Sequence, residues 1–138
     1  MDLEVYQKLL NLHLEVHHLT IKFPKHEMYE LGSQLRRSSN SIAANLAEGW
    51  NNRHVSLYLE GINRSLGELR ETLHHLTVGY MKSYYSQGMY ESLRQRYEEC
   101  GKMLNGLEAI SRMSKNIKTF QMLSKSPLRV FDPKGRGP

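Results

Sequence analysis

The sequence predicts an all-α fold, an antiparallel up-and-down four-helix bundle. Three observations predict it: apolar residues recur at spacings of three and four, alternating strand-like runs are nearly absent, and the connections between helical stretches are short. A 39% share of hydrophobic residues in 138 is enough for one core. We expect the bundle to span residues 1–123 and a basic, flexible tail to span residues 124–138.

The first two helices are predicted over residues 2–22 and 25–48. The first ends at Phe23-Pro24, because the residue before a proline disfavours the helical conformation. Gly49 suits the C-terminal cap of the second helix, and Asn51-Asn52 makes the turn into the third. Two short connections therefore link the first three helices.

Two longer helices are predicted over residues 54–84 and 87–123. In the first of them, apolar seam residues follow one another for three heptads, which is typical of a helix in a bundle. In the second, the seam slips by three residues after Leu107, which predicts that the last turns leave the bundle axis. The seams are Leu59, Ile62, Leu66, Leu69, Leu73, Leu76 and Tyr80, then Tyr90, Leu93, Tyr97, Cys100, Leu104 and Leu107, resuming as Ile110, Met113, Ile117 and Phe120.

The first helix carries two apolar stripes, which lie about 160° apart when residues advance by about 100° each. A helix in a monomeric bundle buries one stripe, and a second exposed stripe is typical of an interface. We therefore predict a homo-oligomer; the alternative is a first helix sunk deeply between its neighbours. The predicted interface residues are Leu3, Leu10, Leu14 and Ile21.

Charge is distributed unevenly along the chain, whose formal net charge is +5. Residues 1–111 hold 12 lysines and arginines against 13 acids, whereas residues 112–138 hold seven basic residues against Asp132 alone. Such a basic end either solubilises the protein or binds a polyanion, since clustered cations displace the counterions condensed on phosphates. We find neither a secretory signal nor an apolar run of the roughly 20 residues that a membrane span needs, so we expect a cytoplasmic protein without a membrane partner.

No motif in the sequence indicates catalysis or a bound cofactor, so we expect a protein that is not an enzyme. Three pairs of potential metal ligands occur at helical spacing. Two of them fall on the outward faces of their helices, and the third has no further ligand with a predicted position. We therefore predict no metal site at these pairs, which are Glu15/His18, Glu71/His74 and His13/His17.

The segment Leu31–Trp50, LGSQLRRSSNSIAANLAEGW, carries a longer motif. It resembles the signature of the four-helix-bundle family of ribosomal-RNA intervening-sequence proteins, which includes the accessory variability proteins of diversity-generating retroelements. The typical Ser-Gln-Leu-Arg-Arg, Ser-Ile and Asn-Ile-Ala-Glu-Gly runs match within residues 33–49, with Leu46 in place of isoleucine. Ala43 stands where many members have a proline, which leaves a kink of this helix open. The resemblance covers about residues 3–120 and implies a four-helix bundle.

The resemblance also implies a homo-pentameric ring or barrel that binds structured RNA or an RNA–DNA hybrid and assists a reverse transcriptase. The alternative is a structural or protein-interaction module without a nucleic-acid role, because members encoded within intervening sequences have no firmly assigned role. From the residues themselves, we expect cations to converge on the rim where the third helix begins and the fourth finishes. For Arg37, ion pairing within or between subunits stays open. The predicted nucleic-acid contacts are Arg36, Arg37, Arg53, Arg112, Lys115, Lys118, Lys125 and Arg129.

Overall fold

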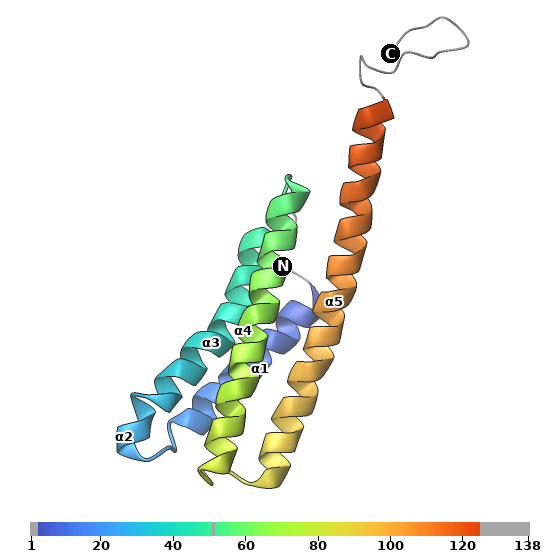
Figure 1. Cartoon of the computed structure of the whole chain (residues 1–138). Helices are drawn as coiled ribbons and strands as arrows, with labels where there is room; N and C mark the ends of the chain where they lie inside the picture. Colours follow the sequence, from blue (N-terminus) through green and yellow to red (C-terminus); the bar gives the residue numbers. More distant parts are fainter. Residues whose placement is uncertain (1–2, 51, 125–138) are drawn as a thin grey trace, which may run out of the picture.

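The computed structural model describes residues 3–50 and 52–124, and all regular structure in this part of the chain is helical (Figure 1). Four long helices and one short helix follow one another, which confirms the prediction of an all-α helical bundle. None of the helices so described is long and apolar enough to cross a membrane. The elements are α1 (Glu4–Thr20), α2 (Lys25–Met28), α3 (Leu31–Gly49), α4 (Val55–Met81) and α5 (Gln87–Ser124).

The four long helices enclose one hydrophobic core. Helix α1 packs against α3 and α5, and α4 packs against the same two helices, so each long helix contacts two others. Each turns its apolar stripe inward, as the periodicity predicts. Cys100 belongs to this core, and burial raises the pKa of its thiol to about 11. Fully buried side chains include Val5, Leu9, Leu35, Ile42, Leu46, Ile62, Leu76, Leu93, Tyr97 and Leu104.

The prediction of one continuous helix over residues 25–48 is wrong, because the helix is interrupted at residues 29–30. The guanidinium of Arg36 donates hydrogen bonds of 2.9 Å to the backbone oxygen of Met28 and to Oγ1 of Thr20, at the end of α1. These bonds satisfy a carbonyl oxygen that a continuous helix would bond internally, so the turn is stable. The apolar periodicity continues across the interruption, and for this reason it does not reveal it.

Polar and aromatic contacts tie α2 to the connection between α4 and α5. The carboxylate of Glu27 is 4% exposed and accepts hydrogen bonds from Lys82 Nζ at 2.6 Å and from Tyr84 Oη at 2.7 Å. These two donors, Lys82 first, lower the pKa of Glu27. The ring of Phe23 lies 5.1 Å from that of Tyr84, and Ser83 takes a left-handed φ of 63° in the turn. We call this region the closed end of the bundle.

The second stripe of α1 does not form one exposed surface. Leu3 and Leu10 are half-buried against the core, whereas Leu14 and Ile21 are about half exposed. Helix α1 contacts both α3 and α5, and Leu3 and Leu10 pack against the core that these helices share. Leu3 and Leu10 thus fit the alternative of a first helix sunk between its neighbours. An oligomer interface that includes all four residues stays a prediction.

Helix α5 is longer than its neighbours. Its 38 residues extend over about 57 Å at about 1.5 Å per residue, and Figure 1 shows its final turns standing beyond the start of α4. Ser111 is its last buried residue. The last turns therefore leave the bundle, as the slipped seam predicts, although the helix itself is unbroken. We call residues 110–124 the α5 tip.

Candidate nucleic-acid interface

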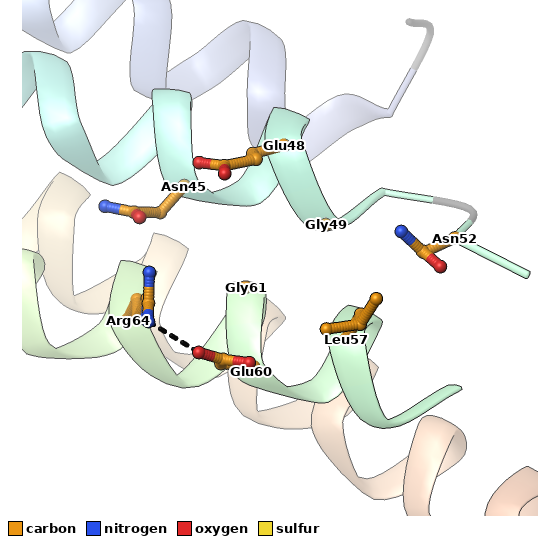
Figure 2. Close-up of a pocket in the computed structure, with 8 residues that line it drawn as sticks. All are labelled: Asn45, Glu48, Gly49, Asn52, Leu57, Glu60, Gly61 and Arg64. Carbon is orange, nitrogen blue, oxygen red and sulfur yellow. Dashed lines mark ion pairs between the residues drawn. The ribbon is translucent and has the colours of Figure 1, made fainter. Parts of the chain in front are cut away.

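The end of the segment Leu31–Trp50 packs against the first half of α4 (Figure 2). A Cβ atom on Gly61 of α4 would lie 2.9 Å from the backbone oxygen of Asn45 and 3.0 Å from Cα of Gly49. Gly49 is helical and Trp50 caps α3, so the prediction of Gly49 as the cap is wrong. Both glycines instead allow two helix backbones to approach closely. Helix α3 also runs through Ala43 without a break.

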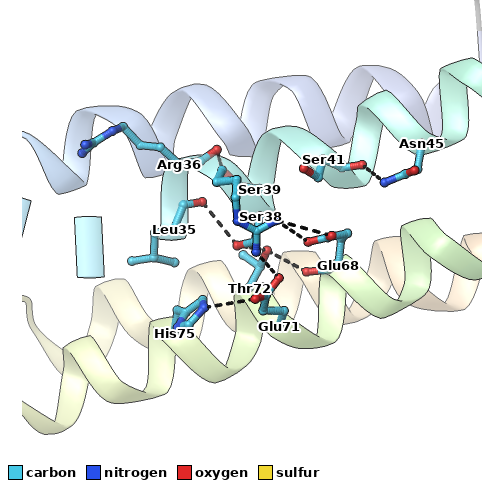
Figure 3. Close-up of polar contacts among 11 residues, drawn as sticks. Leu35, Arg36, Ser38, Ser39, Ser41, Asn45, Glu68, Glu71, Thr72 and His75 are labelled. Atoms are coloured by element: carbon cyan, nitrogen blue, oxygen red, sulfur yellow. Dashed lines mark hydrogen bonds and ion pairs between the residues drawn. The ribbon is translucent and has the colours of Figure 1, made fainter. Parts of the chain in front are cut away.

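A polar network joins the middle of α3 to α4 (Figure 3). Arg37 pairs with Glu71 at 2.5 Å and with Glu68 at 3.5 Å. The Arg37 guanidinium lowers the pKa of Glu71, while burial raises the pKa of Glu68. Next to these ion pairs, the hydroxyls of Ser38 and Thr72 are hydrogen-bonded at 2.8 Å in the buried interface. Ion pairing within one subunit, the alternative stated for Arg37, is what the structure shows.

The guanidinium groups of Arg36 and Arg37 therefore both bind acceptors within the chain. Arg36 is half-buried and bonds the turn between α2 and α3, whereas Arg37 faces the carboxylates of α4. A phosphate at Arg37 would compete with two carboxylates, and a phosphate at Arg36 would break the bonds that hold the turn. The candidate interface excludes these two predicted contacts.

Three cations gather along a groove between the first half of α4 and α5. Arg64 comes from α4, and Arg112 and Lys115 come from α5. Arg64 pairs with Glu60 at 2.5 Å and Arg112 pairs with Glu108 at 2.9 Å, each four residues away on its own helix. Both arginine side chains remain more than half exposed, and each meets one carboxylate where Arg37 meets two, so they stay accessible to a ligand. The groove is lined by Ser56, Leu59, Glu60, Asn63, Arg64, Arg112 and Lys115.

A second hollow lies on the other side of α4, against the end of α3 (Figure 2). It shares Glu60 and Arg64 with the groove, but Glu48 and Asn45 take the place of the α5 cations. Among the residues that line them, the hollow thus has one cation and two carboxylates, whereas the groove has three cations and one carboxylate, with Glu108 paired to Arg112 beside it. This difference in charge favours a phosphate group in the groove over one in the hollow.

The other predicted contacts lie at different distances from the groove along the chain. Lys118 is exposed one turn further along α5, and Arg53 is exposed two residues before α4 begins but does not line the groove. Lys125 and Arg129 lie outside the described residues. Sequence reasoning missed Arg64. The available signal was periodicity, because residues 56, 60, 63 and 64 fall within one arc of about 100° on α4.

The pairs weighed as metal ligands have other partners. Glu15 binds Arg96 through both carboxylate oxygens, Glu71 belongs to the α3–α4 network, and Nδ1 of His13 lies 2.7 Å from Oγ of Ser39. Over residues 3–50 and 52–124, no group of three or more His, Cys, Asp or Glu side chains is placed to hold a metal ion. These side chains instead connect neighbouring helices.

The chain matches one protein family over most of its length. The model of a family described as 23S rRNA-intervening sequence protein matches residues 1–106. Among solved structures, a protein of unknown function from the S23 ribosomal protein family of Bacteroides thetaiotaomicron is similar, with a TM-score of 0.71 and 24% sequence identity. That match covers 76% of this chain and 95% of the other, and it supports the fold alone. No curated protein matches the chain.

Proposed function

Because this chain belongs to the family of 23S rRNA-intervening sequence proteins, we propose that it is a non-enzymatic, homo-oligomeric protein that binds structured RNA or an RNA–DNA hybrid. The groove between α4 and α5, whose lining residues include three cations and one carboxylate, is the observation that carries this proposal. The resemblance of the signature segment supports two further steps. The protein assembles as a pentamer, and it assists a reverse transcriptase.

The groove suits a nucleic-acid backbone more than it suits a base. A guanidinium group binds a phosphate through two parallel N–H···O hydrogen bonds, and Lys115 adds a point charge beside the two arginines of the groove. Lys118 continues the same cationic flank along α5. The up-and-down order of the long helices is part of the proposal, because it returns α5 to the end at which α4 begins. Contacts of this kind position a nucleic acid without reading its sequence, so we expect sequence-neutral binding.

The decisive experiment measures the salt dependence of binding. Lys115→Gln combined with Lys118→Gln removes two exposed cations from α5. Because each phosphate contact releases counterions, we expect the affinity for a structured RNA to fall and the slope of log K against log salt to decrease by about 2. Fluorescence anisotropy over a salt series reports both quantities. A matched RNA–DNA hybrid tests the second substrate.

The chain offers a matched control at its closed end. Lys22 and Lys25 are also exposed, so Lys22→Gln combined with Lys25→Gln removes the same charge from the opposite end of the molecule. We expect the control to bind almost as well as the parent protein, with an unchanged salt slope. Equal effects of the two double variants, or binding that does not depend on salt, would contradict the groove as the interface.

The reverse-transcriptase part of the proposal has a separate test. We expect the parent protein to increase cDNA synthesis on a structured RNA template, and we expect the Lys115→Gln, Lys118→Gln variant to do so less. If the parent protein binds no RNA at physiological salt, the alternative holds. The protein is then a structural or protein-interaction module, for which the exposed apolar side chains of the α5 tip provide a surface.

A further inference from the structure

The α5 tip carries an apolar stripe that the described part of the chain leaves exposed. Ile110, Met113, Ile117 and Phe120 follow at spacings of three, four and three, and their exposed fractions range from 52% to 71%. At about 100° per residue, the four side chains fall within an arc of about 80°. A continuous stripe of this kind on a helix is typical of a surface that another element covers. We call these four residues the tip seam.

The cations of the tip lie on the other side of the helix. Arg112, Lys115 and Lys118 centre about 180° away from the tip seam. Two of them line the groove with α4, so the tip seam faces away from that groove. The positions that border the tip seam are uncharged, and they include Ser114, Asn116 and Gln121.

The placement of these charges indicates which kind of partner covers the tip seam. A helix on an anionic membrane places its cations at the border of the apolar face, where they reach the headgroups, and a helix that binds an acidic protein surface does the same. Two copies of the α5 tip meet only uncharged borders, so these basic helices approach without like charges in contact. We propose that the α5 tips of neighbouring copies pack against one another in parallel through the tip seam. This proposal rests on the homo-oligomer part of the proposed function and names its contact surface.

Parallel packing follows from the position of the tip. The tip stands beyond the start of α4 (Figure 1). When two tips pack in parallel, the two bundles lie side by side at the same end of the tips. When two tips pack antiparallel, each tip points toward the bundle of the other copy. The spacing of the tip seam is that of the a and d positions of two heptads. The match to the family model covers residues 1–106, so the tip seam lies outside the matched segment. Packing through this seam keeps the groove cations on the outer side, free for RNA.

Cysteine cross-linking tests the contact directly. Ile117→Cys places a thiol in the tip seam, and Lys115→Cys places one on the opposite side of the same helix. The native Cys100 is buried and does not react. We expect a short bis-maleimide to join Ile117→Cys chains into covalent dimers and to leave Lys115→Cys chains single. Equal cross-linking at both positions, or none at position 117, overturns the proposal.

Sedimentation without nucleic acid tests whether the tip seam stabilises the assembly. Ile117→Glu places a carboxylate where the second copy packs, so we expect the concentration of half-association to rise at least about tenfold. Thr119→Glu adds the same charge at an exposed position outside the seam, and we expect no change. Circular dichroism shows that both variants keep the fold. Sedimentation of Ile117→Glu that equals that of the parent protein overturns the proposal.

Two other occupants of the tip seam have distinct outcomes. If the full chain sediments as a monomer and a chain that ends at Ser124 associates, the tail covers the seam and the proposal fails. Binding of the monomer to phosphatidylserine vesicles, lost in Ile117→Glu, overturns it as well. None of these measurements contains RNA, so failure of the RNA-binding proposal leaves their interpretation unchanged.

Discussion

The two halves of α5 have the same periodicity and different surroundings. In the first half, Leu93, Tyr97 and Leu104 are fully buried against α1 and α4. In the second half, Ile117 and Phe120 are more than half exposed, although they continue the spacing of three and four. The difference teaches that apolar periodicity predicts a helix and its apolar face, but not whether the element that covers this face belongs to the same chain.

The charged residues of the two halves of α5 also differ in their partners. In the first half of α5, Arg96 pairs with Glu15 of α1, and Glu99 pairs with Lys8 of α1 at 2.7 Å. After Glu108 the helix has no further acid, so the cations of the tip have no carboxylate partner later in α5. Charges of the first half thus pair with α1, whereas Arg112 of the second half pairs with Glu108 of its own helix and Lys115 is exposed in the groove.

The largest effect is expected from equivalent truncations in the two halves. Leu104→Ala leaves a cavity in the core, because the side chain is 0% exposed, and we expect it to lower the free energy of unfolding by about 2–5 kcal/mol. Phe120→Ala removes a larger side chain that is 71% exposed, and we expect a change within about 0.5 kcal/mol. Urea denaturation at low protein concentration, where tips are apart, measures both. Similar losses from the two variants would erase the contrast.

The next effect comes from two glycines of α4 that differ only in their surroundings. Gly61→Ala forces a Cβ to within 2.9 Å of a backbone oxygen, so we expect a loss of about 1–3 kcal/mol. Gly67→Ala is the matched control, because the added Cβ has no neighbour within 4 Å apart from the adjacent residues and backbone of its own helix. Alanine is the better helix former, so we expect this variant to gain up to about 1 kcal/mol. Thermal unfolding of the two variants should therefore shift in opposite directions.

Most of the fold can be predicted from the sequence, because local spacing determines it. The long helices follow from their seams, and Phe23-Pro24 ends the first of them close to where the structure does. The interruption between α2 and α3 cannot be predicted in this way. It depends on bonds from Arg36 to Thr20 and Met28, and Thr20 lies 16 residues away on another helix.

The same limit applies to the candidate site, because local spacing predicts some of its residues and tertiary packing decides the others. Arg112 and Lys115 lie on one flank of a predicted helix, and the structure places them in one groove. Arg37 has an equally exposed position in the sequence pattern, but its partner Glu71 lies 34 residues away. Arg64 completes the groove and was missed, because the facing of two helices decides which cations meet. Local spacing predicts where a charge points, and tertiary packing decides whether it is free.

An acid-sensitive contact distinguishes the closed end from the tip. The pKa of Glu27 lies below its ordinary value in the folded protein, so its stabilising contribution is complete above pH 4.5 and is lost as the pH falls through the lowered value. Glu27→Gln does not titrate, so we expect a less stable protein at pH 7 and a flatter fall of stability below pH 4.5. Glu30→Gln removes an exposed carboxylate nearby and is the control. If Glu27→Gln loses stability in acid as steeply as the parent protein, the closed end is held by other contacts.

The smallest effect is expected from Arg37→Gln, and it tests the division of charges most directly. The Arg37 side chain is 52% exposed, so its ion pairs with Glu68 and Glu71 are screened by water, and we expect a loss of about 0.2–1 kcal/mol. RNA affinity and its salt slope should not change, because these carboxylates already neutralise the charge. Lys115→Gln should show the reverse, with unchanged stability and weaker RNA binding, because Lys115 is exposed in the groove. Chemical denaturation and anisotropy on the same two proteins compare them. If Arg37→Gln weakens RNA binding as much as Lys115→Gln does, the interface extends over α3, and pairing within the bundle does not remove a cation from it.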